Sequence, residues 1–171
     1  MKINDVSLIC FHFGYFSYAK GFKSGGYNDQ TGTQLNPIIP AAARPVDPEF
    51  ADSFELGLKS SLFDNTASLS INAFFVEYED AQRTLNASFP SGQETLFFNA
   101  ADMEVKGFEW EYIWRVNPNF TVLFNGTNMD VSYKKFAADT NFDGTIDVDF
   151  SDQTPQRSPE WMYSLDLNYV Q

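Results

Sequence analysis

The segment with the clearest potential for chemistry is an acidic loop over residues 139–147. Oxygen-bearing side chains occupy every second position of it: Asp139, Asn141, Asp143, Thr145 and Asp147. Together with Gly144 in sixth place, this spacing resembles the first part of an EF-hand calcium loop, whose ligands are hard oxygen atoms. The twelfth position, normally a bidentate glutamate, is Phe150, so Asp149 or Asp152 would have to replace it. The loop is therefore either a weak Ca²⁺ site or a plain polar loop, and no other cofactor is expected.

The types of residue present give little support for a catalytic function. Cys10 is the single cysteine and His12 the single histidine, so the chain offers no disulfide within itself and no histidine-based metal cluster. A Ser–His–Asp triad would have to use His12, which lies in no supporting motif. We therefore predict that the chain is not an enzyme.

The amino-acid composition excludes further classes of function and structure. The net charge of −12 argues against nucleic acid as a partner, because nucleic acid is bound by basic patches. No run of about 18 apolar residues is present, which excludes a transmembrane helix. The chain is nevertheless 43% hydrophobic, with 18 phenylalanines. A transmembrane β-strand stays compatible with this sequence, because only its alternate residues face lipid.

Alternation of apolar and polar side chains is the strongest structural pattern. From Trp161 to Tyr169 every second residue is apolar, and Ser164, Asp166 and Asn168 lie between them. Successive side chains of a strand point to opposite faces, so this pattern indicates a strand with one apolar and one polar face. The chain is predicted to form six strands, over residues 13–20, 50–60, 67–78, 96–112, 120–133 and 160–170.

The predicted connections alternate in length. Those over residues 21–49, 85–94 and 134–159 are long, whereas those over 63–66 and 117–119 are short. Outer-membrane barrels have long loops at one end and short turns at the other. The alternative is a soluble, calcium-dependent β-sandwich that binds carbohydrate, in which the same alternation separates core from surface.

Four segments carry a family resemblance. They are YFSYAKGFKSGGYN at 15–28, PE at 48–49 with SFELGLKS at 53–60, NAFF at 72–75 with Tyr78, Asp80 and Gln82, and NAA at 99–101 with GFEWE at 107–111. In this order and spacing they resemble TonB-dependent outer-membrane receptors. Within that family, the resemblance is to the group of ferric-siderophore receptors. The resemblance covers roughly residues 15–170.

The resemblance implies a fold and a function. The family's barrel has about 22 strands and an N-terminal plug, so residues 13–171 are expected to be an incomplete, all-β, antiparallel barrel segment from its C-terminal half. Residues 1–12 are an unmatched segment, and neither a plug nor a signal peptide is visible. The implied function is energised uptake of a scarce ligand, a ferric siderophore, across the outer membrane of a Gram-negative bacterium. The implied partners are outer-membrane lipid, the ligand and, through the plug, the TonB complex.

Two groups of side chains are candidates for roles in such a barrel. By analogy with the family, Tyr27, Arg44, Arg83 and Phe89 are candidate ligand contacts. Glu55, Glu109 and Glu111 are predicted to form an acidic cluster on the lumen wall, partly neutralised by Lys59 and Arg115. The alternative is a simply solvated lumen wall.

Overall fold

The computed structural model describes residues 11–28, 45–89, 92–139, 145–146 and 148–171. Its strands are β1 (Phe11–Lys23), β2 (Glu49–Leu62), β3 (Ala67–Phe89), β4 (Gly92–Asn117), β5 (Phe120–Ala138), β6 (Val148–Asp149) and β7 (Trp161–Tyr169). The described part contains no helix long and apolar enough to cross a membrane. The division of the chain at residue 12 stays a prediction, since residues 1–10 are not among those described.

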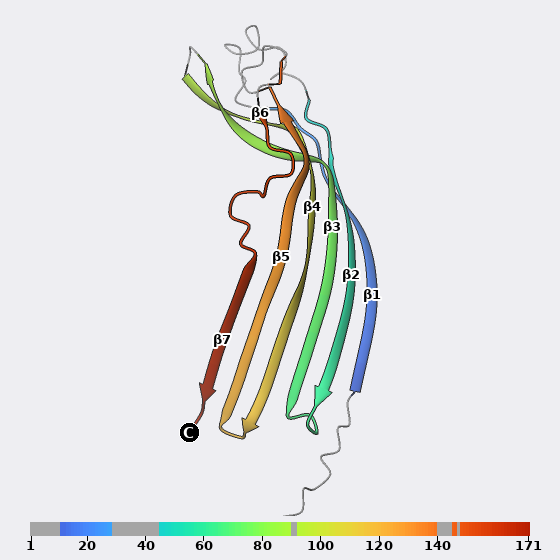
Figure 1. Cartoon of the computed structure of the whole chain (residues 1–171), viewed down its shortest axis with the longest axis vertical. Helices are drawn as coiled ribbons and strands as arrows, with labels where there is room; N and C mark the ends of the chain where they lie inside the picture. The colour runs from blue at the N-terminus through green and yellow to red at the C-terminus, as the bar shows by residue number, and fades with distance from the viewer. Residues whose placement is uncertain (1–10, 29–44, 90–91, 140–144, 147) are drawn as a thin grey trace, which may run out of the picture.

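The strands form one antiparallel sheet. Its order is β1-β2-β3-β4-β5, with the two-residue β6 and then β7 both pairing with β5. Figure 1 shows long, gently curved strands lying side by side in a single layer, with tight turns at one end. The sheet does not close on itself, so β1 and β7 each leave an edge. The predicted all-β antiparallel class is confirmed, and the described strands do not build the second, packed sheet that a sandwich requires.

Strand register places the two kinds of side chain on opposite faces. Directly paired residues of neighbouring strands share a face. The apolar face includes Phe16, Tyr18, Phe54, Leu56, Leu58, Leu62, Ala67, Leu69, Ile71, Ala73, Phe75, Phe108, Trp110, Tyr112, Trp114, Val122, Phe124, Trp161, Tyr163, Leu165 and Leu167. The polar face includes Tyr15, Ser17, Glu55, Lys59, Ser68, Ser70, Asn72, Glu109, Glu111, Asn125, Thr127, Ser164, Asp166 and Asn168.

The two short turns lie where the sequence predicted them. In the β2–β3 turn, Phe63, Asp64 and Asn65 have positive φ angles of 52°, 52° and 66°. Thr66 closes this turn with its N–H and its hydroxyl, which donate to the Phe63 carbonyl at 3.0 and 2.8 Å. In the β4–β5 turn, the Asn119 N–H donates to the Asn117 side chain at 2.9 Å.

The predicted long loop over residues 85–94 is wrong. β3 and β4 stay paired up to the pair Phe89 and Gly92, so only residues 90–91 separate the two strands. Similarly, β5 continues to Ala138, five residues beyond its predicted end. These extensions lie beyond the part of the sheet that has the apolar face, and backbone pairing continues the strands there.

A bulge changes the course of β3 where this extension begins. Asp80 has a φ angle of 54°, and the register with β4 shifts between Tyr78 and Gln82. Beyond the bulge, Ala81, Ala101 and Phe136 are buried, with Tyr78, Phe98 and Tyr133 packed against them. In Figure 1 the far ends of β3 and β4 lean away from the direction of the other strands.

Candidate functional site

The apolar face is far too exposed for a surface in contact with water. Phe16, Leu56, Leu165 and Leu167 expose 67%, 62%, 60% and 61% of their surface. The exposed side chains continue across all the long strands, whereas a soluble monomer rarely shows apolar patches beyond a few hundred Å². This face therefore requires an apolar neighbour.

Aromatic rings are packed tightly on part of this face. A Cβ atom at Gly126 would lie 2.3 Å from Cζ2 of Trp110, so the indole ring occupies the space above the glycine. The ring centroids of Trp110 lie 5.8 Å from Phe124 and 6.4 Å from Trp161. Trp110 pairs directly with Ile71, so these rings lie near the middle of the apolar face.

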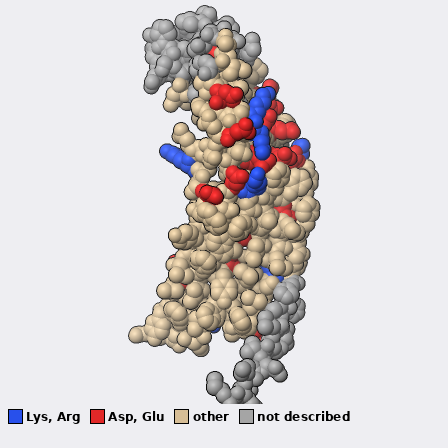
Figure 2. Space-filling view, in the orientation of Figure 1, with Lys and Arg blue, Asp and Glu red and all other residues tan. Residues whose placement is uncertain are grey.

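A belt of charged side chains lies immediately beyond one end of the apolar face. This charged belt consists of Lys20, Asp52, Glu77, Glu104, Lys106, Asp130 and Lys134. Figure 2 shows acidic and basic side chains gathered in the upper part of the visible face, while other residues make up most of the part below. The belt marks the level at which the side chains of this face change from apolar to charged.

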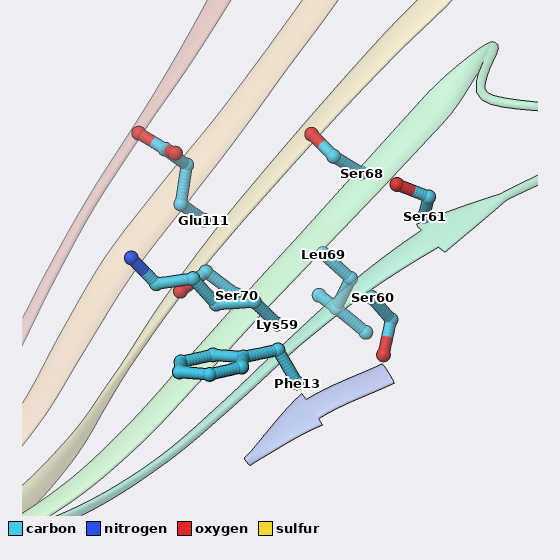
Figure 3. A pocket seen from close by; sticks show the side chains of 8 residues that line it. All are labelled: Phe13, Lys59, Ser60, Ser61, Ser68, Leu69, Ser70 and Glu111. Carbon is cyan, nitrogen blue, oxygen red and sulfur yellow. The ribbon is translucent and has the colours of Figure 1, made fainter. Parts of the chain in front are cut away.

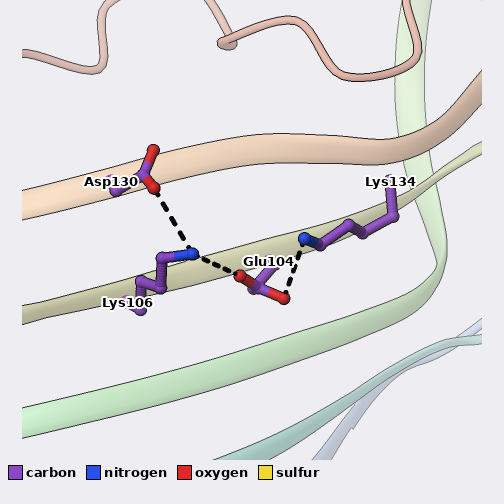
Figure 4. A network of polar contacts seen from close by, with 4 residues as sticks. All are labelled: Glu104, Lys106, Asp130 and Lys134. Atoms are coloured by element: carbon purple, nitrogen blue, oxygen red, sulfur yellow. Dashed lines mark hydrogen bonds and ion pairs between the residues drawn. The ribbon is translucent and has the colours of Figure 1, made fainter.

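Ion pairs link neighbouring strands within the charged belt. Lys20 pairs with Asp52 at 3.2 Å, between β1 and β2. Glu104 of β4 accepts from Lys106 at 2.9 Å and from Lys134 of β5 at 3.1 Å. Lys106 also lies 3.4 Å from Asp130, so four side chains form one network across two strands (Figure 4).

The network gives Glu104 a distinct pH dependence. Hydrogen bonds from Lys106 and Lys134 lower the pKa of Glu104 below its ordinary value. A lowered folded-state pKa means that this interaction stabilises the protein above the ordinary pKa and is lost as the pH falls through the folded-state value. As the pH is lowered from neutral through the ordinary range of carboxyl groups, the denaturant concentration that unfolds the protein should therefore decrease, and it should decrease less steeply in Glu104→Gln. Parallel slopes for the two proteins would contradict this role.

The polar face contains an aromatic residue with a clear structural role. The Tyr15 ring lies over Gly57, where a Cβ atom would be 2.1 Å from Cε1 of the ring. The Tyr15 hydroxyl donates to Glu55 and lies 2.9 Å from Asn72 Oδ1. Glu55 thus accepts a hydrogen bond from a tyrosine, a contact that the sequence alone does not indicate.

The predicted neutralisation of the acidic cluster is only partly reflected in the geometry. Lys59 and Glu111 line one hollow of the polar face, and Figure 3 shows both side chains extending over it. Among the described side chains, neither Lys59 nor Arg115 lies within 4.0 Å of a carboxylate oxygen. The structure thus gives no direct ion pair for either side chain, and the neutralising role of Lys59 and Arg115 stays a prediction.

Replacing Lys59 with glutamate should reduce assembly. Lys59→Glu places a further negative charge in the hollow lined by Glu111, and like charges at this range repel. We expect about a twofold loss of folded protein, counted on unheated electrophoresis gels, and a smaller loss for Lys59→Gln. Unchanged assembly of Lys59→Glu would rule out the neutralising role.

A cluster of hydrogen bonds, here named the polar clasp, ties the ends of the β1–β2 connection to the β3–β4 hairpin. The buried Gln82 donates from Nε2 to the carbonyls of Ser24 and Asp47, both at 3.0 Å. Its backbone N–H donates to Glu49 at 2.7 Å. Through these three hydrogen bonds, Gln82 connects both ends of the β1–β2 connection to β3.

Two asparagines complete the polar clasp. Asn99 donates to the carbonyls of Asp47 and Asp80, at 2.9 and 2.7 Å, and accepts from the Asp47 N–H at 2.7 Å. Asn28 binds the backbone N–H and carbonyl of Phe97, at 2.7 and 2.9 Å. Several members of the clasp belong to the four sequence segments described above: Asn28, Glu49, Asp80, Gln82 and Asn99. Those segments thus specify how the hairpin is anchored.

The comparisons with known proteins agree with this architecture. A family model described as TonB dependent receptor-like, beta-barrel matches residues 3–171. The chain belongs to this family. TonB-dependent receptors are outer-membrane transport proteins of Gram-negative bacteria and not enzymes. The family predicted from the four segments is confirmed.

Solved receptor structures share the fold. The ferric yersiniabactin uptake receptor FyuA from Yersinia pestis is 20% identical, with a TM-score of 0.63 over 93% of this chain and 21% of that one. The siderophore receptor PiuA from Acinetobacter baumannii is 23% identical, with a TM-score of 0.62 over 92% and 22%. The alcaligin outer-membrane receptor FauA from Bordetella pertussis is 17% identical, with a TM-score of 0.52 over 98% and 24%. The chain thus spans less than a quarter of the length of these receptors.

No curated protein matches the sequence. At the identities of the solved structures, the likeness supports the fold and not a particular ligand.

The structure describes the side chains of two of the four candidate ligand contacts of this TonB-dependent receptor segment. Arg83 lines a cavity on the polar face, whereas Tyr27 is exposed. Arg44 and the side chain of Phe89 lie outside the described residues. The structure thus brings one of the four candidates, Arg83, into a cavity.

The predicted calcium loop lies mostly outside the described residues. Asp139 and Thr145 are described, while Asn141, Asp143 and Asp147 are not. The described residues include no group of three or more side chains arranged to hold a metal. Calcium binding stays a prediction: calorimetric titration should show saturable heat at millimolar Ca²⁺ that is lost in Asp143→Asn. Absence of heat at several millimolar Ca²⁺ would overturn it.

Proposed function

We propose that the chain forms part of the wall of an outer-membrane receptor barrel, with its apolar face toward lipid and its polar face toward the lumen. The receptor would take up a scarce ligand, a ferric siderophore, with energy supplied through the TonB complex. The observation that carries this proposal is the sorting of side chains by face, with the charged belt at one boundary. No chemistry on the ligand is implied.

The height of the apolar face supports the lipid assignment. In β2 the apolar face extends from Phe54 to Leu62, about 9 residues or ~30 Å at ~3.3 Å per residue. A tilted transmembrane strand needs about 9–11 residues. The charged belt then lies outside the hydrocarbon layer, where ion pairs stay hydrated.

The open edges support a larger barrel. β1 and β7 each leave unpaired backbone groups at the side of the sheet. Lipid does not tolerate such groups, because each unsatisfied N–H or carbonyl there costs several kcal/mol. We therefore expect further strands to pair with both edges and close the wall.

The ligand class is inferred from the structural neighbours. All three receptors described above are named for siderophores or their uptake, and the ferric siderophore proposed for this chain rests on that kinship. The TonB complex as energy source comes from the family.

Uptake by cells tests this function. The source strain, a deletion of the gene and its complemented form would be given radiolabelled iron on hydroxamate, catecholate and phenolate siderophores in turn. We expect the deletion to lose energised uptake of at least one complex, and a protonophore to abolish the same uptake in the parent. Equal uptake of all three complexes by deletion and parent would contradict the ligand class, and recovery of the protein outside the membrane fraction would contradict the barrel.

A further inference from the structure

An open hollow of about 460 Å³ lies where the apolar face meets the charged belt. This boundary hollow is lined by residues of β1, β2 and β3 that all lie on the apolar face by strand register: Phe16, Tyr18, Lys20, Asp52, Phe54 and Glu77. Aromatic rings line one part of it, and charged side chains line the other. The boundary hollow is therefore amphipathic, and the proposed function places it at the surface of the lipid layer.

The aromatic part of the boundary hollow faces the lipid side. Phe16 and Tyr18 are exposed, and the Tyr18 ring packs against Phe54 with a centroid distance of 5.0 Å. The Tyr18 hydroxyl donates to Asp52. The apolar body of the tyrosine thus lies among rings, and its polar tip lies at the charged residues. An acyl chain on these rings would bring its headgroup to those charges.

Lys20 supplies the positive charge of the boundary hollow. Its Nζ lies 3.2 Å from Asp52 Oδ2, and more than half of the side chain is exposed. An ammonium group has three N–H donors, so the contact with Asp52 leaves donors free for a phosphate oxygen. Asp52 already accepts hydrogen bonds from both Tyr18 and Lys20, so its own charge is compensated.

Glu77 brings a second carboxylate to the boundary hollow. It lies directly opposite Asp52 on β2 and Glu104 on β4, and like charges in direct opposition repel. No basic side chain of the described residues lies within 4.0 Å of Glu77. A bare phosphate would add to the repulsion, whereas a phosphate that carries Mg²⁺ would relieve it. Carboxylates and phosphate oxygens commonly hold Mg²⁺ together.

An aromatic pair lies one step beyond the charged residues, farther from the apolar face. Phe22 and Phe50 are directly paired between β1 and β2, and they expose 73% and 37% of their surface. The Phe50 centroid lies 5.9 Å from Lys20 Nζ, so both rings and charge are within reach of one headgroup. Such rings offer a flat apolar surface on which the C–H groups of a sugar ring can pack.

We infer that the boundary hollow binds a phosphorylated glycolipid of the outer leaflet. The leaflet follows from the position of the hollow at the end of the sheet away from the short turns, because short turns of such barrels face the periplasm. The acyl chain lies on Phe16 and Phe54. A phosphate binds Lys20 directly and Glu77 through Mg²⁺, and a sugar ring packs on Phe22. The inference rests on the proposed function, since it needs the apolar face in lipid, and adds a lipid class and its place.

Native mass spectrometry tests the inference on the protein purified from its own membranes and depleted of lipid in mild detergent. The probes, added with Mg²⁺, are bisphosphorylated lipid A and phosphatidylglycerol, which has a phosphate but no sugar. We expect saturable binding of lipid A, about tenfold weaker in Lys20→Gln, and weaker binding of phosphatidylglycerol. Lys23→Gln is the matched control, because Lys23 lies in the same strand on the polar face, and it should bind like the parent.

Two further measurements keep the test decisive. Phe22→Ser should weaken the binding of lipid A but not that of phosphatidylglycerol. A chelator should weaken the binding of lipid A to the parent, and have a smaller effect on Glu77→Gln. Unchanged affinity in Lys20→Gln, or equal affinities of the parent for the two lipids, would overturn the inference. Recovery of the folded protein in washed membranes, measured on unheated gels, reports separately on the proposed barrel.

Discussion

Replacing Ile71 with arginine is expected to remove most of the assembled protein from the membrane. Ile71 is the central residue of the apolar-face run of β3 from Ala67 to Phe75, and its side chain is 40% exposed on that face. An arginine at the middle of the lipid layer costs about 2–4 kcal/mol in barrels. This is a large part of the total stability of an ordinary domain, about 5–15 kcal/mol.

The neighbouring residue provides the matched control. Ser70 lies in the same strand and points to the polar face, where Lys59 is its direct neighbour on β2. Ser70→Arg adds the same side chain on the side exposed to water, so assembly should stay close to that of the parent. The measurement is the amount of folded protein in washed membranes, read on unheated gels. Equal behaviour of the two variants would contradict the assignment of the faces.

Replacing Gly107 with alanine is expected to separate β4 from β5. A Cβ atom at Gly107 would lie 2.1 Å from the backbone oxygen of Asn128, 2.9 Å from the Met129 Cα and 3.0 Å from the Phe74 ring. Two of these contacts are with the backbone of a paired strand, which cannot shift without loss of its hydrogen bonds. Overpacking of this kind costs about 1–3 kcal/mol, and we expect a value at the upper end or above.

Gly21 is the control for this substitution. It is also a strand glycine, in β1, but a Cβ atom there would have no neighbour within 4 Å. Gly21→Ala should unfold at the same denaturant concentration as the parent, whereas Gly107→Ala should unfold at a clearly lower one. Matching midpoints for the two variants, measured in detergent by tryptophan fluorescence, would show that the close approach at Gly107 is not a constraint.

The faces of the sheet were predictable from sequence because alternation is a local property. Leu56 and Leu58 are apolar and Glu55 and Lys59 are charged, and this difference does not depend on the rest of the chain. The alternation with a period of two residues therefore identifies both faces of the strand. The short turns were predictable for a similar reason, since Asn119 and its neighbours favour turns by their own chemistry.

The extension of β3 beyond the apolar face was missed although Leu85, Ala87 and Phe89 alternate with Asn86 and Ser88. This run is short, and Pro90 and Gly92 directly after it favour a loop, yet β3 and β4 remain paired up to Phe89 and Gly92. The Asp80 bulge, which changes the register, has no signal in a two-residue period.

The cavity was only partly predictable. Arg83 was a candidate by family analogy, but Tyr133 and Phe150 are distant in sequence. The pairing of β3, β4 and β5 brings Tyr133 to the cavity, and the pairing of β6 with β5 brings Phe150 there. Phe136, three residues past the predicted end of the fifth strand, was the available signal. Tyr15 was missed for a related reason: its role depends on Gly57 directly opposite, which only the register shows.

The central claim, lipid on one face and water on the other, is tested most directly by spin labels along β2. In a background lacking Cys10, single cysteines at Glu55, Leu56, Leu58 and Lys59 would carry a nitroxide in the membrane-embedded protein. Labels at Leu56 and Leu58 should collide mainly with oxygen, and those at Glu55 and Lys59 mainly with a water-soluble nickel chelate. Access of the nickel chelate to all four positions would contradict the account.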